Sequence, residues 1–174
     1  MAFGDRPFGL NAIRLISRTV TPVTVNLPVS RTMTFTPRMM GGELKGSDQL
    51  ASVAAFIEAL EWEIDEGGMP LDALALMTGF TATLSGTTPT QVNTLKLLTA
   101  KAMPYFKIFG KVLGEGIDDV HVKIFKAKLT NNIDGQFAYG EFYGLGLSGV
   151  AVADGANGLV DIVQNETAAA LPSS

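Results

Sequence analysis

Alternation of apolar and polar residues is the dominant pattern in this chain, and it predicts strands over most of its length. The clearest stretch reads LEWEID at residues 60–65. A period of two places its three large apolar side chains on one face of a strand and its acids on the other. These acids are Glu61, Glu63 and Asp65. Residues 51–66 are therefore a predicted strand, and the alternation of Thr with Met33 and Phe35 predicts another at 32–37. The Gly-rich, polar stretch 38–49 between them is predicted to be a long loop.

One helix is predicted at about residues 69–78. Pro70 suits the first helical position, and Asp72 suits the positive end of the helix dipole. Gly79 suits the residue after the helix end, where a left-handed backbone is common. The segment is apolar on nearly all sides, so we expect the helix to be buried.

Further strands are predicted downstream of the helix. The segment 91–103 is ambiguous, because its apolar residues fit either a strand or a helix, and we interpret it as a strand. Two strands flank GEGIDD and predict a hairpin, and the dipeptides Asp-Gly and Asn-Gly at 154–158 predict a turn before the last strand. The predicted strands are 80–84, 91–103, 105–113, 120–129, 136–143 and 159–163. The fold class is therefore mainly β with one flanking helix, in a single domain 1–174 with arm-like termini at about 1–8 and 167–174.

Composition adds an expectation of self-association. Hydrophobic residues make up 47% of the chain and charged residues only 17%, against about 25% in average globular proteins. The charges also alternate in blocks: residues 1–38 carry a net charge of +4, 43–72 of −7, 96–128 of +4 and 129–174 of −5. Blocks of opposite sign favour head-to-tail contacts between copies. The alternatives are a large monomeric core and a fold that interleaves the blocks.

The sequence offers little for catalysis or for metal binding. Cysteine is absent, which excludes thiolate metal sites and cysteine nucleophiles, and the single histidine, His121, has no partner at a catalytic or metal-ligand spacing. The acids at 58–66 lack the calcium-loop spacing and suit a solvated strand face. GLGLSG at 144–149 matches G-x-G-x-x-G, but the alternating residues that follow predict no helix to receive a phosphate. We therefore expect no enzyme activity, no cofactor and no metal, and we interpret the glycines as a bulge or a close backbone approach.

Targeting signals are also absent from the sequence. The N-terminus lacks a charged segment followed by an apolar run, and the longest apolar stretch, 50–60, is short and contains Glu58. We expect a soluble protein made in the cytoplasm, without a membrane anchor. Without a secretion signal, the sequon at Asn165 does not indicate glycosylation.

Three segments resemble the tail tube proteins of long, flexible-tailed bacteriophages (siphophages). The strand, turn and buried helix of that family are similar to EWEIDEGGMPLDALALMTG (61–79). Its middle hairpin is similar to YFKIFGKVLGEGIDDVHVKIFKAKL (105–129), and its last strands are similar to GQFAYGEFYGLGLSGVAVADGANGLVDIVQNETA (135–168). The resemblance covers roughly residues 30–168.

The resemblance implies a structural role in a virion tail. Tail tube subunits are β-sandwiches or barrels that form hexameric rings, and the stacked rings form the channel for DNA ejection. Residues 31–38 and 50–66 would line the inner barrel, with the three strand acids facing the lumen so that DNA slides without sticking. The predicted loop would contact the next ring through Arg38, Met39, Met40, Glu43, Lys45 and Asp48.

The same resemblance implies partners and leaves alternatives open. The expected partners are further copies of the chain, the tape measure, tail tip and terminator proteins, and DNA in transit. An inner tube of a contractile tail or a secretion system shares this fold. From another class, a soluble β-barrel that binds a small apolar ligand fits the strand pattern, and its oligomeric state would distinguish it.

Overall fold

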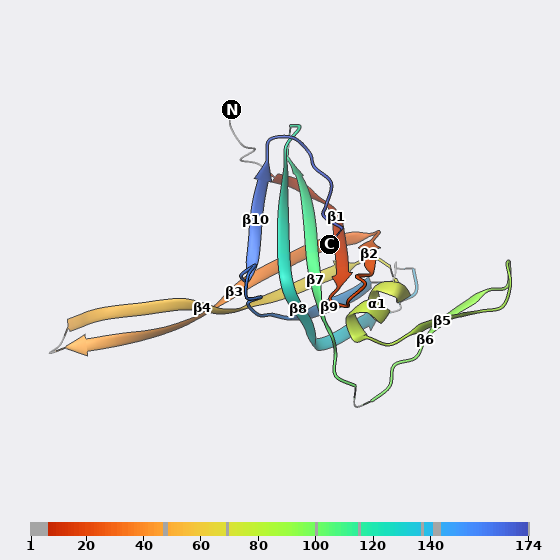
Figure 1. Ribbon diagram of the computed structural model, residues 1–174, viewed down its shortest axis with the longest axis horizontal. Helices are drawn as coiled ribbons and strands as arrows, with labels where there is room; N and C mark the ends of the chain where they lie inside the picture. Colours follow the sequence, from red (N-terminus) through yellow and green to blue (C-terminus); the bar gives the residue numbers. More distant parts are fainter. Residues whose placement is uncertain are drawn as a thin grey trace.

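The computed structural model describes residues 7–46, 49–68, 70–99, 101–114, 116–136, 138–140 and 144–173. Within these ranges it is mainly β, as predicted, with one short helix (Figure 1). The elements in chain order are β1 (Pro7–Ser17), β2 (Thr24–Leu27), β3 (Ser30–Gly46), β4 (Gln49–Glu66), α1 (Leu71–Thr78), β5 (Ala82–Ser85), β6 (Val92–Leu95), β7 (Tyr105–Gly114), β8 (Asp119–Gln136), β9 (Gly144–Ala151) and β10 (Val160–Asn165).

The main sheet is antiparallel and bends along β8. Its order is β2-β1-β7-β8-β9-β4-β3, and β10 pairs with β8 beside this path. Residues 119–124 of β8 pair with β10, whereas residues 127–136 pair with β9. The sheet thus divides into a β1 half-sheet (β2, β1, β7, the first part of β8, and β10) and a β4 half-sheet (the second part of β8, β9, β4 and β3). Figure 1 shows the strands of the two halves crossing.

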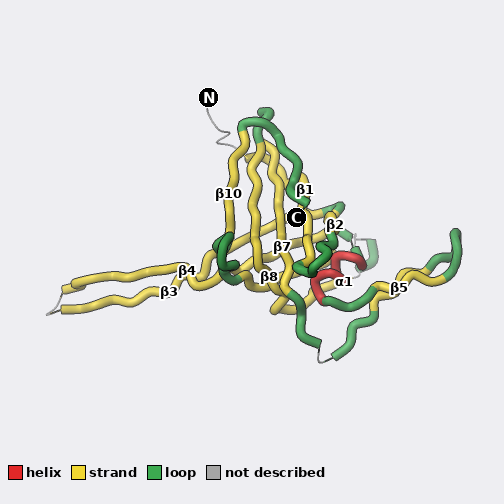
Figure 2. Tube along the Cα trace, viewed as in Figure 1, coloured by secondary structure: helices red, strands yellow, loops and turns green. Residues whose placement is uncertain are grey.

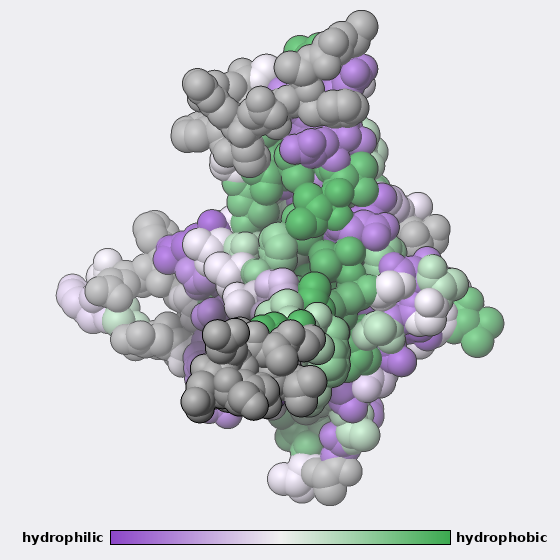
Figure 3. Space-filling model, turned by 90° about the vertical axis from the view of Figure 1, so that its left-hand side faces the viewer, coloured by the Kyte–Doolittle hydropathy of each residue, from purple (hydrophilic) through white to green (hydrophobic). Residues whose placement is uncertain are grey.

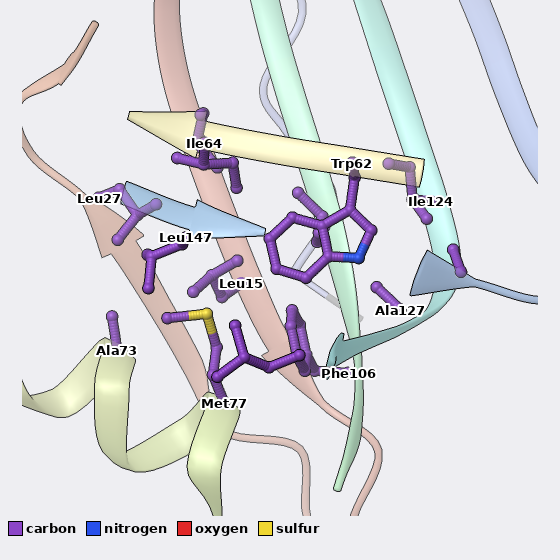
Figure 4. Close-up of a cluster of buried hydrophobic side chains, with 14 of the residues drawn as sticks. Leu15, Leu27, Trp62, Ile64, Ala73, Met77, Phe106, Ile124, Ala127 and Leu147 are labelled. Carbon is purple, nitrogen blue, oxygen red and sulfur yellow. The ribbon is translucent and has the colours of Figure 1, made fainter. Parts of the chain in front are cut away.

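The core lies between the two half-sheets. Trp62 of β4 packs edge-to-face on Phe106 of β7, with the ring centroids 5.7 Å apart. The helix α1 adds Ala73 and Met77, both fully buried, at one side of this cluster (Figure 4). The other side chains labelled there come from both half-sheets: Leu15, Leu27, Ile64, Ile124, Ala127 and Leu147. Burying an aromatic pair of this size supplies several kcal/mol, so this crossing holds the two halves together.

A second, smaller cluster lies on the outer face of the β1 half-sheet. It contains Ile16, Phe109 and Phe125, which face away from the main core. The C-terminal segment runs back over this face, and its Leu171 covers the three side chains, leaving only 8% of Leu171 exposed. The segment 167–173 was predicted to be arm-like, and in this structure it lies along β1 and β7.

The G-x-G-x-x-G segment forms β9, and a turn at 154–158 follows it instead of a helix. The prediction that no helix follows this segment is confirmed. Gly149 lies at a point of close approach: a Cβ there would be 2.1 Å from the carbonyl oxygen of Lys128 and 2.8 Å from the Trp62 ring. The facing strand is bulged between Leu129 and Ile133. The predicted close backbone approach is therefore confirmed.

Most predicted elements are confirmed. The helix begins at Leu71 and ends at Thr78, and Gly79 adopts the expected left-handed conformation with φ 71°. The alternation in LEWEID is confirmed, because Leu60, Trp62 and Ile64 are buried while the acids lie on the other face. The hairpin around GEGIDD corresponds to β7 and β8, and the turn before the last strand precedes β10.

Four predictions need correction. The loop predicted at 38–49 is wrong, because β3 continues to Gly46 and pairs with β4 up to Gln49. The strand predicted at 136–143 is wrong over its described part: β8 ends at Gln136, and residues 139–140 form a turn. Residues 137 and 141–143 lie outside the described residues. The predicted strand 91–103 is limited to β6, and β5 begins two residues later than predicted.

Candidate assembly surfaces

The outward face of the β4 half-sheet is polar and acidic. Glu61 and Glu63 are exposed and Asp65 is half-buried, so the three predicted acids do share one face of β4. The acids lie opposite Thr36, Thr34 and Thr32 of β3 on one side, and opposite Val150, Ser148 and Gly146 of β9 on the other. None of these register partners is basic. The face therefore presents a row of carboxylates between two rows of mostly small, polar or hydroxyl-bearing residues.

Arg38 stands at one end of this acidic row. Its Nε lies 3.3 Å from Glu58, and its Nη1 lies 3.7 Å from Glu61. All three side chains are about half exposed, so solvent weakens these ion pairs, each of which contributes at most about 1 kcal/mol. Arg38 offsets part of the charge of Glu61, whereas Glu63 forms no ion pair with any described residue. The negative charge is thus strongest toward the C-terminal end of β4, at Glu63 and Asp65.

The β4 half-sheet has two free edges among the described residues. One is β3, which pairs only with β4. The other is the end of β8: pairing with β7 reaches Lys128, so residues 129–136 pair only with β9. Exposed edges of this length are open to pairing with another chain. The four-stranded half-sheet therefore offers one edge to a neighbour on each side.

The free ends of β3 and β4 form a long projecting pair of strands, which we call the β3–β4 arm (residues 39–46 and 49–57). A bulge at its base leaves Glu58 as an extra residue between the pairs Arg38–Ala59 and Met39–Ile57. Figure 2 shows the arm extending well beyond the body as strand. Its exposed apolar side chains are Met39 (59%), Met40 (47%), Val53 (59%), Phe56 (56%) and Ile57 (53%).

The residues predicted for a stacking loop thus lie at the base of this arm and along it. Arg38, Met39, Met40 and Glu43 are exposed. The backbone of Lys45 pairs with that of Leu50, and Asp48 lies outside the described residues. The sequence therefore located an exposed, projecting segment correctly but predicted the wrong backbone conformation for it.

A second projecting hairpin and a groove lie at the opposite end of the molecule, and the sequence pattern did not reveal either. The strands β5 and β6 pair only with each other and expose Leu84 and Val92. Beside their base, a groove of about 920 Å³ opens between α1, the β1–β2 segment and the start of β5. Its lining is largely apolar and includes Val23, Val25, Leu76, Phe80, Pro104 and Tyr105.

Exposed apolar surface also occurs on the body. Figure 3 views the molecule from the side of the β3–β4 arm and shows green apolar areas on the body between purple polar ones. Leu113, Ile117 and Ile162 are 36%, 75% and 60% exposed.

The C-terminal segment is fixed by a buried charge cluster around Asp119. This carboxylate, fully buried, accepts hydrogen bonds from Lys111 (2.9 Å), Asn165 (2.6 Å) and the backbone N–H of Ala169 (2.7 Å). Burial alone would raise the pKa of Asp119, but the hydrogen bonds, that from Lys111 foremost, hold the pKa well below its usual range. His121 also lies 3.2 Å from Asp119 and is buried, which agrees with a structural role for this histidine.

Arg14 extends the same attachment. Its guanidinium donates to the carbonyl oxygens of Leu171 and Pro172 at 2.6 and 3.1 Å. Nearby, Arg18 pairs with Asp154 at 2.9 Å, and hydrogen bonds from Arg18 and Asn157 lower the pKa of Asp154 to about 2.

Comparison with known proteins adds no family assignment. No protein-family model matches the chain, and no curated protein matches it in sequence. Within the described ranges, no group of three or more metal-ligating side chains is close enough to hold a metal ion. The one helix in the described part of the chain is too short to cross a membrane.

Proposed function

We propose that the chain is a structural subunit of a bacteriophage tail tube, in which copies close into rings and the rings stack around a channel for DNA. The observation that carries the proposal is the β4 half-sheet. It combines two free edges with an outward face of carboxylates and hydroxyls, and its inner face packs against the core through buried side chains such as Trp62, Ile64 and Leu147. Unpaired strand edges promote pairing with other chains, so a sheet of this kind is unfavourable in a monomer and suits an assembly.

The direction of the strands supports ring closure. All neighbours in the β4 half-sheet are antiparallel, so β3 runs opposite to the end of β8. Under rotational symmetry about an axis along the strands, β3 of one copy would meet β8 of the next. Because the half-sheet has an even number of strands, the antiparallel alternation continues across every junction. A ring closed in this way has no free edge.

The acidic face would then line the channel. Carboxylates at the positions of Glu61, Glu63 and Asp65 repel the phosphates of DNA, and none of their direct register partners on β3 and β9 is basic. Such a wall lets DNA move without sticking. The subunit needs no catalytic residue for this role.

The resemblance of the sequence supplies the remaining parts of the proposal. The rings would be hexameric, the β3–β4 arm would reach the adjacent ring, and the tape measure, tail tip and terminator proteins would contact the tube. The mature location would be the virion tail. An inner tube of a contractile tail or a secretion system would use the same β4 half-sheet, and only the proteins bound around it would distinguish these cases.

A soluble carrier remains the second candidate, and the apolar groove beside α1 is the observation that favours it. Negative-stain electron microscopy of the purified protein separates the two. The tube proposal predicts hollow tubes or rings with a central channel. If the protein stays a monomer at millimolar concentration, with or without an initiating tail-tip complex, the tube proposal fails.

A further inference from the structure

The β3–β4 arm and the groove beside α1 lie at opposite ends of the molecule. In Figure 1 the arm extends to one side along the longest axis, and α1 with the β5–β6 hairpin lies at the other side. A projection at one end and a hollow at the other allow copies to join head to tail. Head-to-tail contacts build open stacks wherever the rotation between copies does not close into a ring.

The arm has a surface that its own chain leaves uncovered. Beyond the bulge at Arg38, it consists of two strands, and five large apolar side chains along it are roughly half exposed. A two-stranded hairpin is at best marginally stable in water by itself. A second surface that covers Phe56 and Ile57 would therefore stabilise the extended form of the arm.

The groove offers a surface of the same character. Val23, Leu76 and Phe80 line it, and the Lys101 ammonium lies over the Phe80 ring, 4.7 Å from its centroid. Its volume of about 920 Å³ is large enough for several apolar side chains. The groove thus matches the arm in apolar character and in size.

The charges of the two surfaces are opposite. The sequence 39–57 contains Glu43 and Asp48 against Lys45, so it carries a net charge of −1. The groove is bordered by Arg18, Lys126 and Lys101, with Asp72 as the acid in its lining. Complementary charge favours the correct register of two surfaces and disfavours arm-to-arm or groove-to-groove contacts.

We propose that the groove between α1, the β1–β2 segment and β5 receives the β3–β4 arm of a second copy of this chain. The inference rests on the proposed function insofar as stacked rings supply that second copy. The groove beside α1 would then form part of the interface between stacked copies.

The absence of cysteine from the chain permits a direct cross-linking test. Ile57→Cys places a thiol on the arm, and Thr81→Cys places one in the groove lining. The two variants are mixed and oxidised, and the covalent heterodimer is quantified on non-reducing gels. The matched control replaces Thr81→Cys with Ile162→Cys, which is exposed on β10 far from the groove.

The proposal predicts at least tenfold more heterodimer for the arm–groove pair than for the control pair, and little homodimer of Ile57→Cys alone. Equal yields for the two pairs would overturn it. A second variant, Ile57→Asp, changes an exposed side chain and should leave the fold intact. It is expected to form single rings that do not stack; stacked tubes of normal length from Ile57→Asp would also overturn the proposal.

These outcomes separate the inference from the tube proposal. Arm–groove cross-links without any ring or tube would support the inference and contradict the tube. Tubes without arm–groove cross-links would support the tube and contradict the inference.

Discussion

Replacing Gly149 by alanine should destabilise the subunit strongly, because this position has no room for a Cβ atom. The added carbon would lie 2.1 Å from the carbonyl oxygen of Lys128 and 2.8 Å from Cζ2 of Trp62. Real Cβ atoms essentially never come closer than 3.0 Å to another heavy atom, so β8 would have to move by about 0.9 Å. That movement strains the pairing of β8 with β9 and displaces the largest side chain of the core.

The expected cost is about 3 kcal/mol. Overpacking of a well-filled core costs about 1–3 kcal/mol, and a strained backbone hydrogen bond adds about 1 kcal/mol. For a chain of this size such a loss corresponds to a fall in Tm of about 6–12 °C. Gly144→Ala is the matched control, since it lies on the same strand and a Cβ there would meet no atom within 4 Å. It should change stability by less than about 1 kcal/mol.

The assay is guanidinium unfolding followed by tryptophan fluorescence, at a concentration at which the protein is monomeric. Trp62 is the single tryptophan and is 2% exposed, so its emission reports on the core that the substitution disturbs. If Gly149→Ala and Gly144→Ala lie within about 0.5 kcal/mol of each other, the argument from close approach is refuted.

Three further predictions concern charged groups. Asp119→Asn should lower stability by about 2–3 kcal/mol, because Lys111 loses its buried carboxylate, whereas the exposed Asp161→Asn should be neutral within about 0.5 kcal/mol in the same unfolding assay. Because Asp119 and Asp154 have lowered pKa values in the folded state, the stability they contribute is fully present above about pH 5. It should fall as the pH drops from about 4 to 2, and Asp119→Asn should show a smaller decrease in Tm over that window; equal decreases would contradict the assignment. The combined variant E61Q/E63Q/D65N should assemble normally but slow DNA release from particles, and unchanged release kinetics would remove the role assigned to the acidic face.

The order of apolar and polar residues was sufficient to predict the elements whose own sequence determines which face is buried. The strand around Trp62 was predictable because one face packs in the core and the other faces outward, which imposes a period of two. The helix was predictable because Pro70 and Gly79 mark its ends and its residues fill one side of the core. The three acids of β4 could be assigned to one face for the same reason.

The mistaken elements depend on contacts that the sequence pattern does not encode. Residues 39–43 and 53–57 of the β3–β4 arm are exposed on both faces, so no alternation marks them, and Gly41 and Gly42 pair with the small residues Ala55 and Ala54. The end of β8 is polar and bulged, and β9 alone pairs with it there. Its strand conformation is therefore set by tertiary pairing.

Some of the candidate surfaces could likewise be predicted from the sequence, and others could not. The acidic face could be predicted because it lies on one strand. The groove could not be predicted, because its lining comes from segments as distant in sequence as Val23, Leu76 and Tyr105. The outer cluster was also hidden, because Ile16 and Phe109 face away from the main core and are covered by Leu171 from the chain end.

The central claim is that the β4 half-sheet closes into a ring through its two free edges, and a cryo-electron microscopy reconstruction of assembled particles tests it most directly. The account predicts a continuous antiparallel barrel in which β3 of each copy pairs with residues 129–136 of β8 of its neighbour, with Glu63 on the channel wall. A reconstruction in which β3 is unpaired, or in which the β4 half-sheet faces the outside of the particle, would contradict the account.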